Sequence, residues 1–371
     1  MTGNKILMIM TAALLVAGSG AMAQIIYGSP AAGGVQFYYT DWTIDTGEEE
    51  ASISQTTIPV TGFVPLQDNL EALFYAAMSS NSLTQRGNDF SMSGLTDVRV
   101  MLNRSFSNDR LLASVGLNLP IGKKKLDLAE EWIIVEYLSQ NFLSFPVRRL
   151  GEGLGISLML GGVGMLGELK CGGGIMYQVN GSYEPYDGFE DYNPGDMFSI
   201  NGGTEHNINN FTLSTNLIYS TYGADNVDGD KVFEQGDEVN MAVSGFLDNE
   251  TYDGAASVRY VWRGRNATYD TTGSVIERLK FYGNEFSIAT MVTWYPVKDW
   301  SISPGVDYKM IASNENGFGD SKIFGFGARF GRQLNEKTDI GLGVKFYTGN
   351  ADDSNLDLSG LQITAGISAK L

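Results

Sequence analysis

Residues 111–121 read LLASVGLNLPI, and this stretch decides the fold class. Its odd positions, from Leu111 to Ile121, are all apolar, whereas most of its even positions are small or polar. Successive side chains of a β-strand point to opposite faces, so a strand with one face in lipid and the other in a wet lumen alternates in this way. The stretch therefore predicts one membrane strand of a β-barrel.

The same alternation recurs along the chain. It marks sixteen segments: 34–44, 51–62, 69–79, 94–106, 111–121, 152–163, 168–183, 196–206, 210–222, 236–248, 254–265, 284–296, 300–312, 322–332, 339–349 and 360–371. Most have the length of a tilted membrane strand, roughly 9–11 residues, plus a short overhang. We predict an all-β, antiparallel, up-and-down transmembrane barrel of about sixteen strands. Fourteen is the alternative, because the segments 34–44, 51–62 and 196–206 alternate poorly and Pro304 interrupts the lipid-facing side of another segment.

Connection lengths give the predicted barrel a direction. Connections after even-numbered segments are short, and those after odd-numbered segments are mostly long, at 80–93, 122–151, 184–195, 223–235, 266–283 and 349–359. Short periplasmic turns and long extracellular loops are typical of bacterial barrels. The pattern places both termini in the periplasm, and the last segment can close the barrel against the first.

Residues 1–23 have the pattern of a cleaved signal peptide. Lys5 precedes an apolar run at 6–16, and Ala21-Met22-Ala23 is a cleavage signal. We expect residues 24–371 to form a single barrel domain in the outer membrane of a Gram-negative-type bacterium. Its expected partners are outer-membrane lipid and lipopolysaccharide, the barrel-assembly machinery, periplasmic chaperones and a small-molecule solute.

Composition excludes several other functions. The chain has 43 acidic and 25 basic residues, so it has no affinity for nucleic acid phosphates. With one cysteine, Cys171, and one histidine, His206, it can form neither an internal disulfide nor a histidine metal cluster. We expect no metal, no cofactor and no enzymatic activity, because no G-x-S-x-G motif accompanies His206. The acidic loops are expected to be solvated rather than to bind divalent cations.

Charged residues inside predicted strands should face the lumen, because a charge facing lipid is costly. These candidates for lumen lining and selectivity are Asp97, Arg99, Arg259, Arg263, Arg265, Asp307, Lys309, Arg329 and Lys345. One hypothesis is that the three arginines at 259, 263 and 265 form a basic ladder that sets anion or solute preference. The alternative is that they pair with lumenal carboxylates and fill the interior.

The connection at 122–151 is unusually long and apolar. Residues 128–142 predict a short helix, whose candidate contact residues are Trp132, Ile133, Val135, Leu138 and Phe142. So much apolar surface needs a partner. The helix either folds over or into the pore mouth, where it would offer a hydrophobic site to a solute, or rests on the rim or in the lipid interface.

Four short motifs carry a family resemblance. They are TIPV at 57–60, DNLE at 68–71, SGLTD at 93–97 and LPIGK at 119–123. Over residues 55–160 the chain resembles outer-membrane channels of the FadL type and the related MetA-type proteins of phenol-degradation operons. The resemblance implies a barrel for uptake of hydrophobic or aromatic small molecules. We therefore expect a channel for passive uptake of small solutes, with a non-conducting structural or surface-binding barrel with a filled lumen as the alternative.

Overall fold

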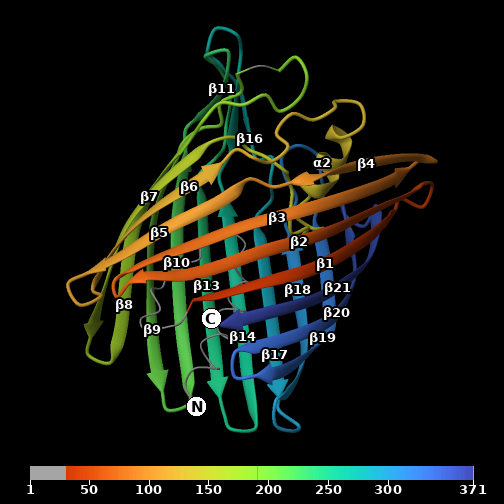
Figure 1. Cartoon of the computed structure of the whole chain (residues 1–371). Helices are drawn as coiled ribbons and strands as arrows, with labels where there is room; N and C mark the ends of the chain where they lie inside the picture. The colour runs from red at the N-terminus through yellow and green to blue at the C-terminus, as the bar shows by residue number, and fades with distance from the viewer. Residues whose placement is uncertain (1–30, 190, 371) are drawn as a thin grey trace.

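The computed structural model describes residues 31–189 and 191–370, so the predicted signal peptide lies outside the described residues (Figure 1). Its large sheet consists of β1 (Ala32–Asp45), β2 (Glu50–Gln67), β3 (Leu70–Gln85), β4 (Asn88–Leu95), β5 (Val98–Phe106), β6 (Leu111–Leu119), β7 (Gly155–Leu166), β8 (Leu169–Asn180), β9 (Met197–Ile208), β10 (Phe211–Tyr222), β13 (Glu238–Asp248), β14 (Tyr252–Arg263), β17 (Glu285–Trp294), β18 (Trp300–Ile311), β19 (Ser321–Asn335), β20 (Thr338–Ala351) and β21 (Leu356–Lys370). Each pairs antiparallel with its neighbours.

The sheet closes into a barrel of sixteen strands. β4 and β5 both pair with β3, one after the other along its length, so together they fill one position in the wall. β1 and β21 close the wall through a continuous ladder from Ala32–Lys370 to Asp45–Asp357. The predicted count of sixteen strands is therefore confirmed.

Pro304 does not interrupt the wall. It pairs with Ala328 of β19 on one side, while the ladder to β17 on the other side lapses between Gly305 and Ile302. A proline has no N–H to donate, so it fits where a ladder is already interrupted. β18 is therefore a complete strand of the wall although it contains Pro304.

The outer face of the barrel is apolar over most of its circumference. Exposed residues on neighbouring strands include Leu117, Leu158, Ile175, Ile200, Leu217, Met241, Val258, Ile288, Val306, Phe326, Leu342 and Ile363. Apolar side chains on the outside of a closed barrel require hydrocarbon around them. The fold is therefore that of a transmembrane barrel. Separately, none of the helices in the described residues is long and apolar enough to cross a membrane.

Where β1, β2, β3 and β4 extend beyond this belt, the polar side chains face outward and the apolar ones inward. Trp42, Ile53 and Leu83 point inward and are fully buried. The outward positions between them carry hydroxyl groups, such as Ser54 and Ser82. This sector therefore lies in water on its outer side and has an apolar core on its inner side. The prediction of a loop at 80–93 was wrong, because these residues continue β3 and form β4.

Two of the long connections form a second, smaller sheet. Its strands are β11 (Ala224–Val227), β12 (Asp230–Glu234), β15 (Asn266–Tyr269) and β16 (Val275–Leu279). It stands above the barrel rim at the end that carries the long loops, which we call the loop end (Figure 1). The opposite end carries the short connections and is called the turn end.

Glycines bring the connections of the loop end close to the neighbouring strand ends. A Cβ added to Gly283 would lie 1.6 Å from the carbonyl oxygen of Ala312, and one added to Gly195 would lie 2.0 Å from that of Gly223. Real atoms do not approach this closely, so only glycine permits these contacts.

We expect Gly283→Ala to destabilise the barrel by about 1–3 kcal/mol, the usual cost of overpacking. The measurement is the temperature at which the purified protein loses its compact migration in detergent gels. Gly164→Ala is the matched control, because nothing lies within 4 Å of a Cβ added there. Equal midpoints for the two variants would contradict the steric argument.

Candidate functional site

The longest connection of the barrel is clamped at both ends by one carboxylate. We call residues 120–154, between β6 and β7, the inner loop. Asp97 accepts hydrogen bonds from the backbone N–H groups of Gly122 at 2.9 Å and Glu152 at 2.8 Å. It also accepts one from the Asn118 side chain at 2.9 Å. The two ends of the inner loop therefore leave the wall side by side.

Between these ends the inner loop folds into the barrel. Its buried apolar residues are Leu126, Ile134, Val135, Leu138, Phe142, Leu143, Phe145, Val147 and Leu150. They pack in one cluster with inward residues of the wall: Trp42, Ile44, Ile53, Leu83, Met92, Ile311, Ile323 and Leu358. The sequence left two placements open for the predicted helix: in the pore, or on the rim or in the lipid interface. In the structure the inner loop that carries the helix lies inside the pore.

Polar contacts fix the middle of the inner loop to two distant parts of the wall. Gln55 on β2 forms two hydrogen bonds with the Val147 backbone, donating at 2.6 Å and accepting at 3.1 Å. On β18, Lys309 donates to the carbonyl of Asn141 at 3.1 Å and to the hydroxyl of Ser144. The inner loop therefore reaches from β2 to β18 and narrows the lumen.

The predicted helix is shorter than expected. α2 spans only Trp132–Leu138, within the predicted range 128–142. Before it, the carboxylate of Asp127 accepts hydrogen bonds from the N–H groups of Ala129 and Glu130, which holds a turn rather than a helix. Phe142 follows the helix and stacks on Phe318 at 5.8 Å between ring centroids.

The candidate residues of the helix differ in burial. Val135 and Leu138 are buried, whereas Trp132 and Ile133 are partly buried. Trp132 meets Tyr186 edge-on at 5.1 Å and lies under the guanidinium of Arg149 at 5.5 Å. These residues therefore pack the inner loop against the wall and against the next loop.

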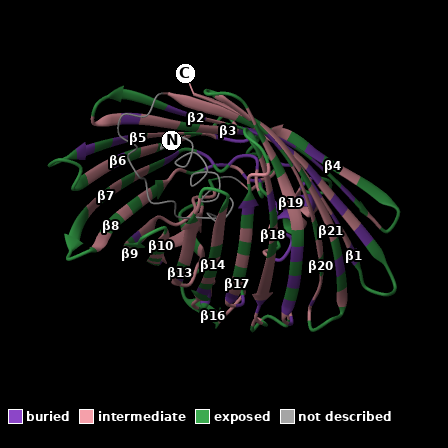
Figure 2. Cartoon of the chain, turned by 90° about the horizontal axis from the view of Figure 1, so that it is seen from below, coloured by how far each residue is buried: buried purple, intermediate pink, exposed green. Residues whose placement is uncertain are grey.

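The other side of the lumen is not filled by the inner loop. From Gly173 onward the residues of β8 alternate between exposed and half-buried, and none in the strand is buried. Its inward residues Met176 and Gln178 are half-buried, whereas the inward residues of β1 and β2 are buried. In Figure 2 buried positions recur along β1 and are absent from β8. Among the described residues, an accessible lumen remains beside β7–β10.

Two of the predicted arginines face this lumen and pair with carboxylates. Arg263 lies 3.3 Å from Glu238 and 3.5 Å from Glu285. Arg259 lies 3.8 Å from Glu285 and donates to Asn240 at 3.0 Å. Glu285 is 7 % exposed and lies between the two arginines. The third arginine, Arg265, lies beyond the end of β14 and pairs with Glu315 at 2.6 Å.

The inner loop adds another cation to this group. Desolvation lowers the pKa of Arg148; Glu285 opposes the shift, whereas Arg263 and Arg259 add to it. The positive charge of Arg148 also repels that of Lys309. We call Arg148, Arg259, Arg263 and Lys309, together with Glu238 and Glu285, the constriction cluster. It contains four cations and two carboxylates. The Asp307–Lys345 ion pair beside Lys309 adds one charge of each sign, so an excess of positive charge remains.

The remaining candidates have separate positions. Asp307 and Lys345 form an ion pair across β18 and β20. Arg99 points inward from β5 and lies 3.6 Å from Glu152. Arg329 points inward from β19, where its guanidinium occupies the space left by the missing side chain of Gly341. Asp97 is buried and clamps the inner loop.

Sequence reasoning missed Arg148, Glu238 and Glu285. Arg148 was overlooked because it lies in a loop, where strand periodicity gives no direction to a side chain. The Arg148-Arg149 pair, directly after the apolar run 145–147, is a signal that could have found it. Glu238 and Glu285 lie at the very start of the predicted segments 236–248 and 284–296, and are the first residues of β13 and β17. Too few strand residues precede them for the alternation to assign their side chains to the lumen. Among the described residues, no group of His, Cys, Asp or Glu is placed to hold a metal ion.

Comparisons with known proteins give structural neighbours only. No family model and no curated protein matches the sequence. OccAB1 of Acinetobacter baumannii is 11% identical, with 92% of this chain and 97% of that chain covered and a TM-score of 0.46. OpdL of Pseudomonas aeruginosa is 9% identical, with 93% and 99% covered and a TM-score of 0.47. An anion-selective porin from Comamonas acidovorans is 10% identical, with 92% and 99% covered and a TM-score of 0.41.

The resemblance to the FadL-type family is wrong. Channels of that type have fourteen strands, whereas this barrel closes with sixteen. The motifs behind the resemblance have a local explanation: SGLTD at 93–97 is the break between β4 and β5, and LPIGK at 119–123 begins the inner loop. A Cβ on Gly122 would lie 2.2 Å from the carbonyl oxygen of Leu150, so the clamp itself requires a glycine there.

Proposed function

We propose that this protein is an outer-membrane channel for the passive, non-enzymatic uptake of small solutes, and that its constriction favours anions. One observation carries the proposal: the inner loop fills one sector of the barrel and leaves the other accessible. The constriction cluster lies where these sectors meet, on β13, β14, β17 and β18. A solute that passes through the barrel therefore passes this cluster.

The charge of the constriction is opposite to that of the chain. The whole chain carries a net charge of −18, yet the constriction cluster has more cations than carboxylates. Charge within a narrow, low-dielectric passage acts on a permeating ion more strongly than charge on solvated loops. The local excess of positive charge therefore supports a preference for anions.

The position in the membrane is part of the same proposal. The apolar outer belt supports a lipid-facing wall, and the unequal connections support a loop end that faces the outside of the cell. Export behind a signal peptide at residues 1–23, and insertion by the barrel-assembly machinery with periplasmic chaperones, follow from that location.

Ion selectivity in planar bilayers tests the constriction. We expect Arg148→Gln to lower the anion-to-cation permeability ratio roughly twofold to fivefold and Glu285→Gln to raise it similarly, since each changes one charge in the passage. Arg86→Gln and Glu250→Gln are matched controls, because they make the same charge changes at exposed connections. The measurement is the reversal potential in a salt gradient.

Unchanged reversal potentials in both lumenal variants would overturn the proposed selectivity. If the wild-type protein conducts no ions and liposomes containing it do not swell in sugars or carboxylates of similar size, the barrel is closed. That result would favour a structural or surface-binding barrel with a filled lumen.

A further inference from the structure

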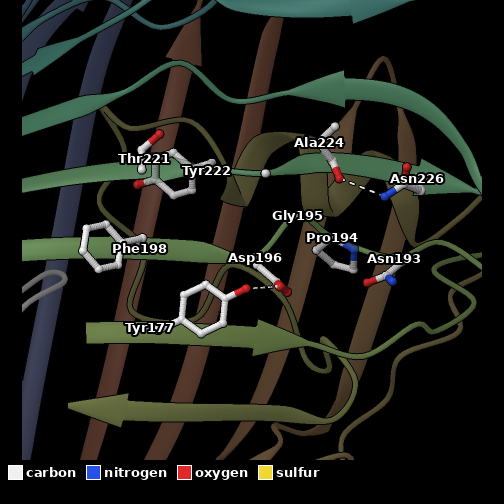
Figure 3. A pocket seen from close by; sticks show the side chains of 11 residues that line it. Tyr177, Asn193, Pro194, Gly195, Asp196, Phe198, Thr221, Tyr222, Ala224 and Asn226 are labelled. Atoms are coloured by element: carbon white, nitrogen blue, oxygen red, sulfur yellow. Dashed lines mark hydrogen bonds between the residues drawn. The ribbon is translucent and has the colours of Figure 1, made fainter. Parts of the chain in front are cut away.

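A cavity of about 430 Å³ opens at the loop end of the wall, beside β8, β9 and β10 (Figure 3). Tyr177, Phe198 and Thr221 line it from the three strands, and Asn193, Asp196 and Asn226 line it from the connections. None of these residues belongs to the constriction cluster. The cavity is therefore separate from the proposed passage.

The strand register places the cavity on the lipid-facing side. Tyr177 pairs with Leu158 on one side and with Phe198 on the other, and Phe198 pairs with Thr221. Paired residues of antiparallel strands share a face. Leu158 is 54 % exposed and belongs to the apolar outer belt, as does Ile175, two residues before Tyr177. The cavity thus lies directly above a surface that acyl chains cover.

Two hydrogen bonds of the same kind, each from an outward tyrosine to an aspartate, place the cavity at the membrane–water interface. Tyr177 donates to Asp196 at 2.6 Å, and Tyr219 donates to Asp237 at 2.8 Å. Outward tyrosines with an apolar body and a hydrogen-bonded hydroxyl are typical of the membrane–water interface. Tyr219 makes the same contact but does not line the cavity. A substitution of Tyr219 therefore tests the contribution of the membrane interface without changing the cavity.

The lining of the cavity disfavours an anionic ligand. Asp196 carries the charge of the lining, which contains no lysine or arginine. Next to it, Asp225 accepts a hydrogen bond from the N–H of Gly195 at 2.8 Å. A phosphate placed here would meet the Asp196 carboxylate and no cation of the lining. The lining therefore excludes an anionic headgroup.

The same lining suits a sugar ring. The aromatic rings of Tyr177 and Phe198 offer apolar surface to its C–H groups. The amide of Asn226 donates one hydrogen to the carbonyl of Ala224 at 2.9 Å, so its second N–H and its oxygen remain for hydroxyl groups. The amide oxygen of Asn193 can also accept from a hydroxyl group. Asp196 accepts from Tyr177 and from the N–H of Asn180 at 3.2 Å, and a carboxylate has about four acceptor positions, so acceptor positions remain for a ligand.

We propose that this cavity binds the uncharged sugar headgroup of a membrane glycolipid, whose acyl chains lie along the outer belt at Leu158 and Ile175. The inference rests on the membrane position in the proposed function, but not on conduction. A cavity that binds no glycolipid can therefore be distinguished from a barrel that conducts no solute.

Native mass spectrometry of the folded, full-length protein tests the cavity. The probes are a monoglucosyl diacylglycerol and a phosphatidylglycerol with the same acyl chains. We expect the glucosyl lipid to bind more tightly, and Tyr177→Leu or Phe198→Leu to weaken its binding roughly fivefold, the scale of one lost aromatic contact. Tyr219→Leu should bind it like the wild type.

Equal retention of the two lipids by the wild type would overturn the proposal. An equal loss in Tyr219→Leu would also overturn it, since the effect would then belong to the interface as a whole. Compact migration in detergent gels verifies that each variant is folded, and the two cavity variants provide independent tests. All three variants should keep the wild-type conductance.

Discussion

Replacing residues 128–142 of the inner loop with a short glycine–serine linker is expected to raise the single-channel conductance roughly twofold or more. These residues include α2 and Phe142, which fill the sector of the lumen beside Trp42, Ile53 and Leu83. Without them, that sector would open to water and widen the conducting cross-section. Single-channel recordings in planar bilayers measure the change.

The matched control is the same linker in place of residues 224–234, which form β11 and β12 above the rim. That change should leave the conductance near the wild-type value. Because the deletion uncovers apolar wall residues, Gln55→Ala provides a second variant that keeps every loop residue. It removes the two hydrogen bonds to Val147 and one to Asn81 of the wall. A wild-type conductance in both inner-loop variants would show that the loop does not narrow the channel.

Asp97→Ala is expected to reduce the free energy of unfolding by about 2–4 kcal/mol, because it removes the acceptor of several hydrogen bonds at once. The N–H groups of Gly122 and Glu152 would lose their partner, and the two ends of the inner loop would separate from the wall. The open-channel current should also become noisier as the loop moves. Denaturant titration and single-channel recording measure the two effects.

Asp97→Asn is the graded comparison, since its amide keeps one acceptor oxygen and should cost less. Asp109→Ala provides the position control: Asp109 is exposed in the turn between β5 and β6 and accepts a hydrogen bond from Ser105. We expect its effect to stay within about 0.5 kcal/mol. If Asp97→Ala were as stable as Asp109→Ala, the carboxylate would not be the clamp.

The wall of the barrel could be predicted because the residue pattern of each strand depends on what its own two faces contact. Residues 111–121 alternate because one face meets lipid and the other the lumen, and this requirement holds for each strand separately. The same argument located all sixteen strands, including the one that contains Pro304. It also placed Arg259 and Arg263 on the inward face.

Strand boundaries failed where the surroundings changed. β3 and β4 extend into 80–93, where hydroxyl groups face outward and Leu83 and Met92 face inward. This alternation is the reverse of that in a lipid-facing strand, so a search for lipid-facing alternation reads it as a loop. A strand with this reversed pattern is stable only when another part of the chain, here the inner loop, covers its apolar inner face.

The sequence by itself determined the barrel and its strand directions, because alternation is a local property with a period of two residues. Only the tertiary structure decided what fills the barrel. Gln55 meets Val147 across 92 residues of sequence, and Lys309 meets Ser144 across 165. No periodicity encodes contacts between a loop and a wall so far away, so neither the inner loop nor Arg148 in the constriction cluster could be placed before the barrel was closed.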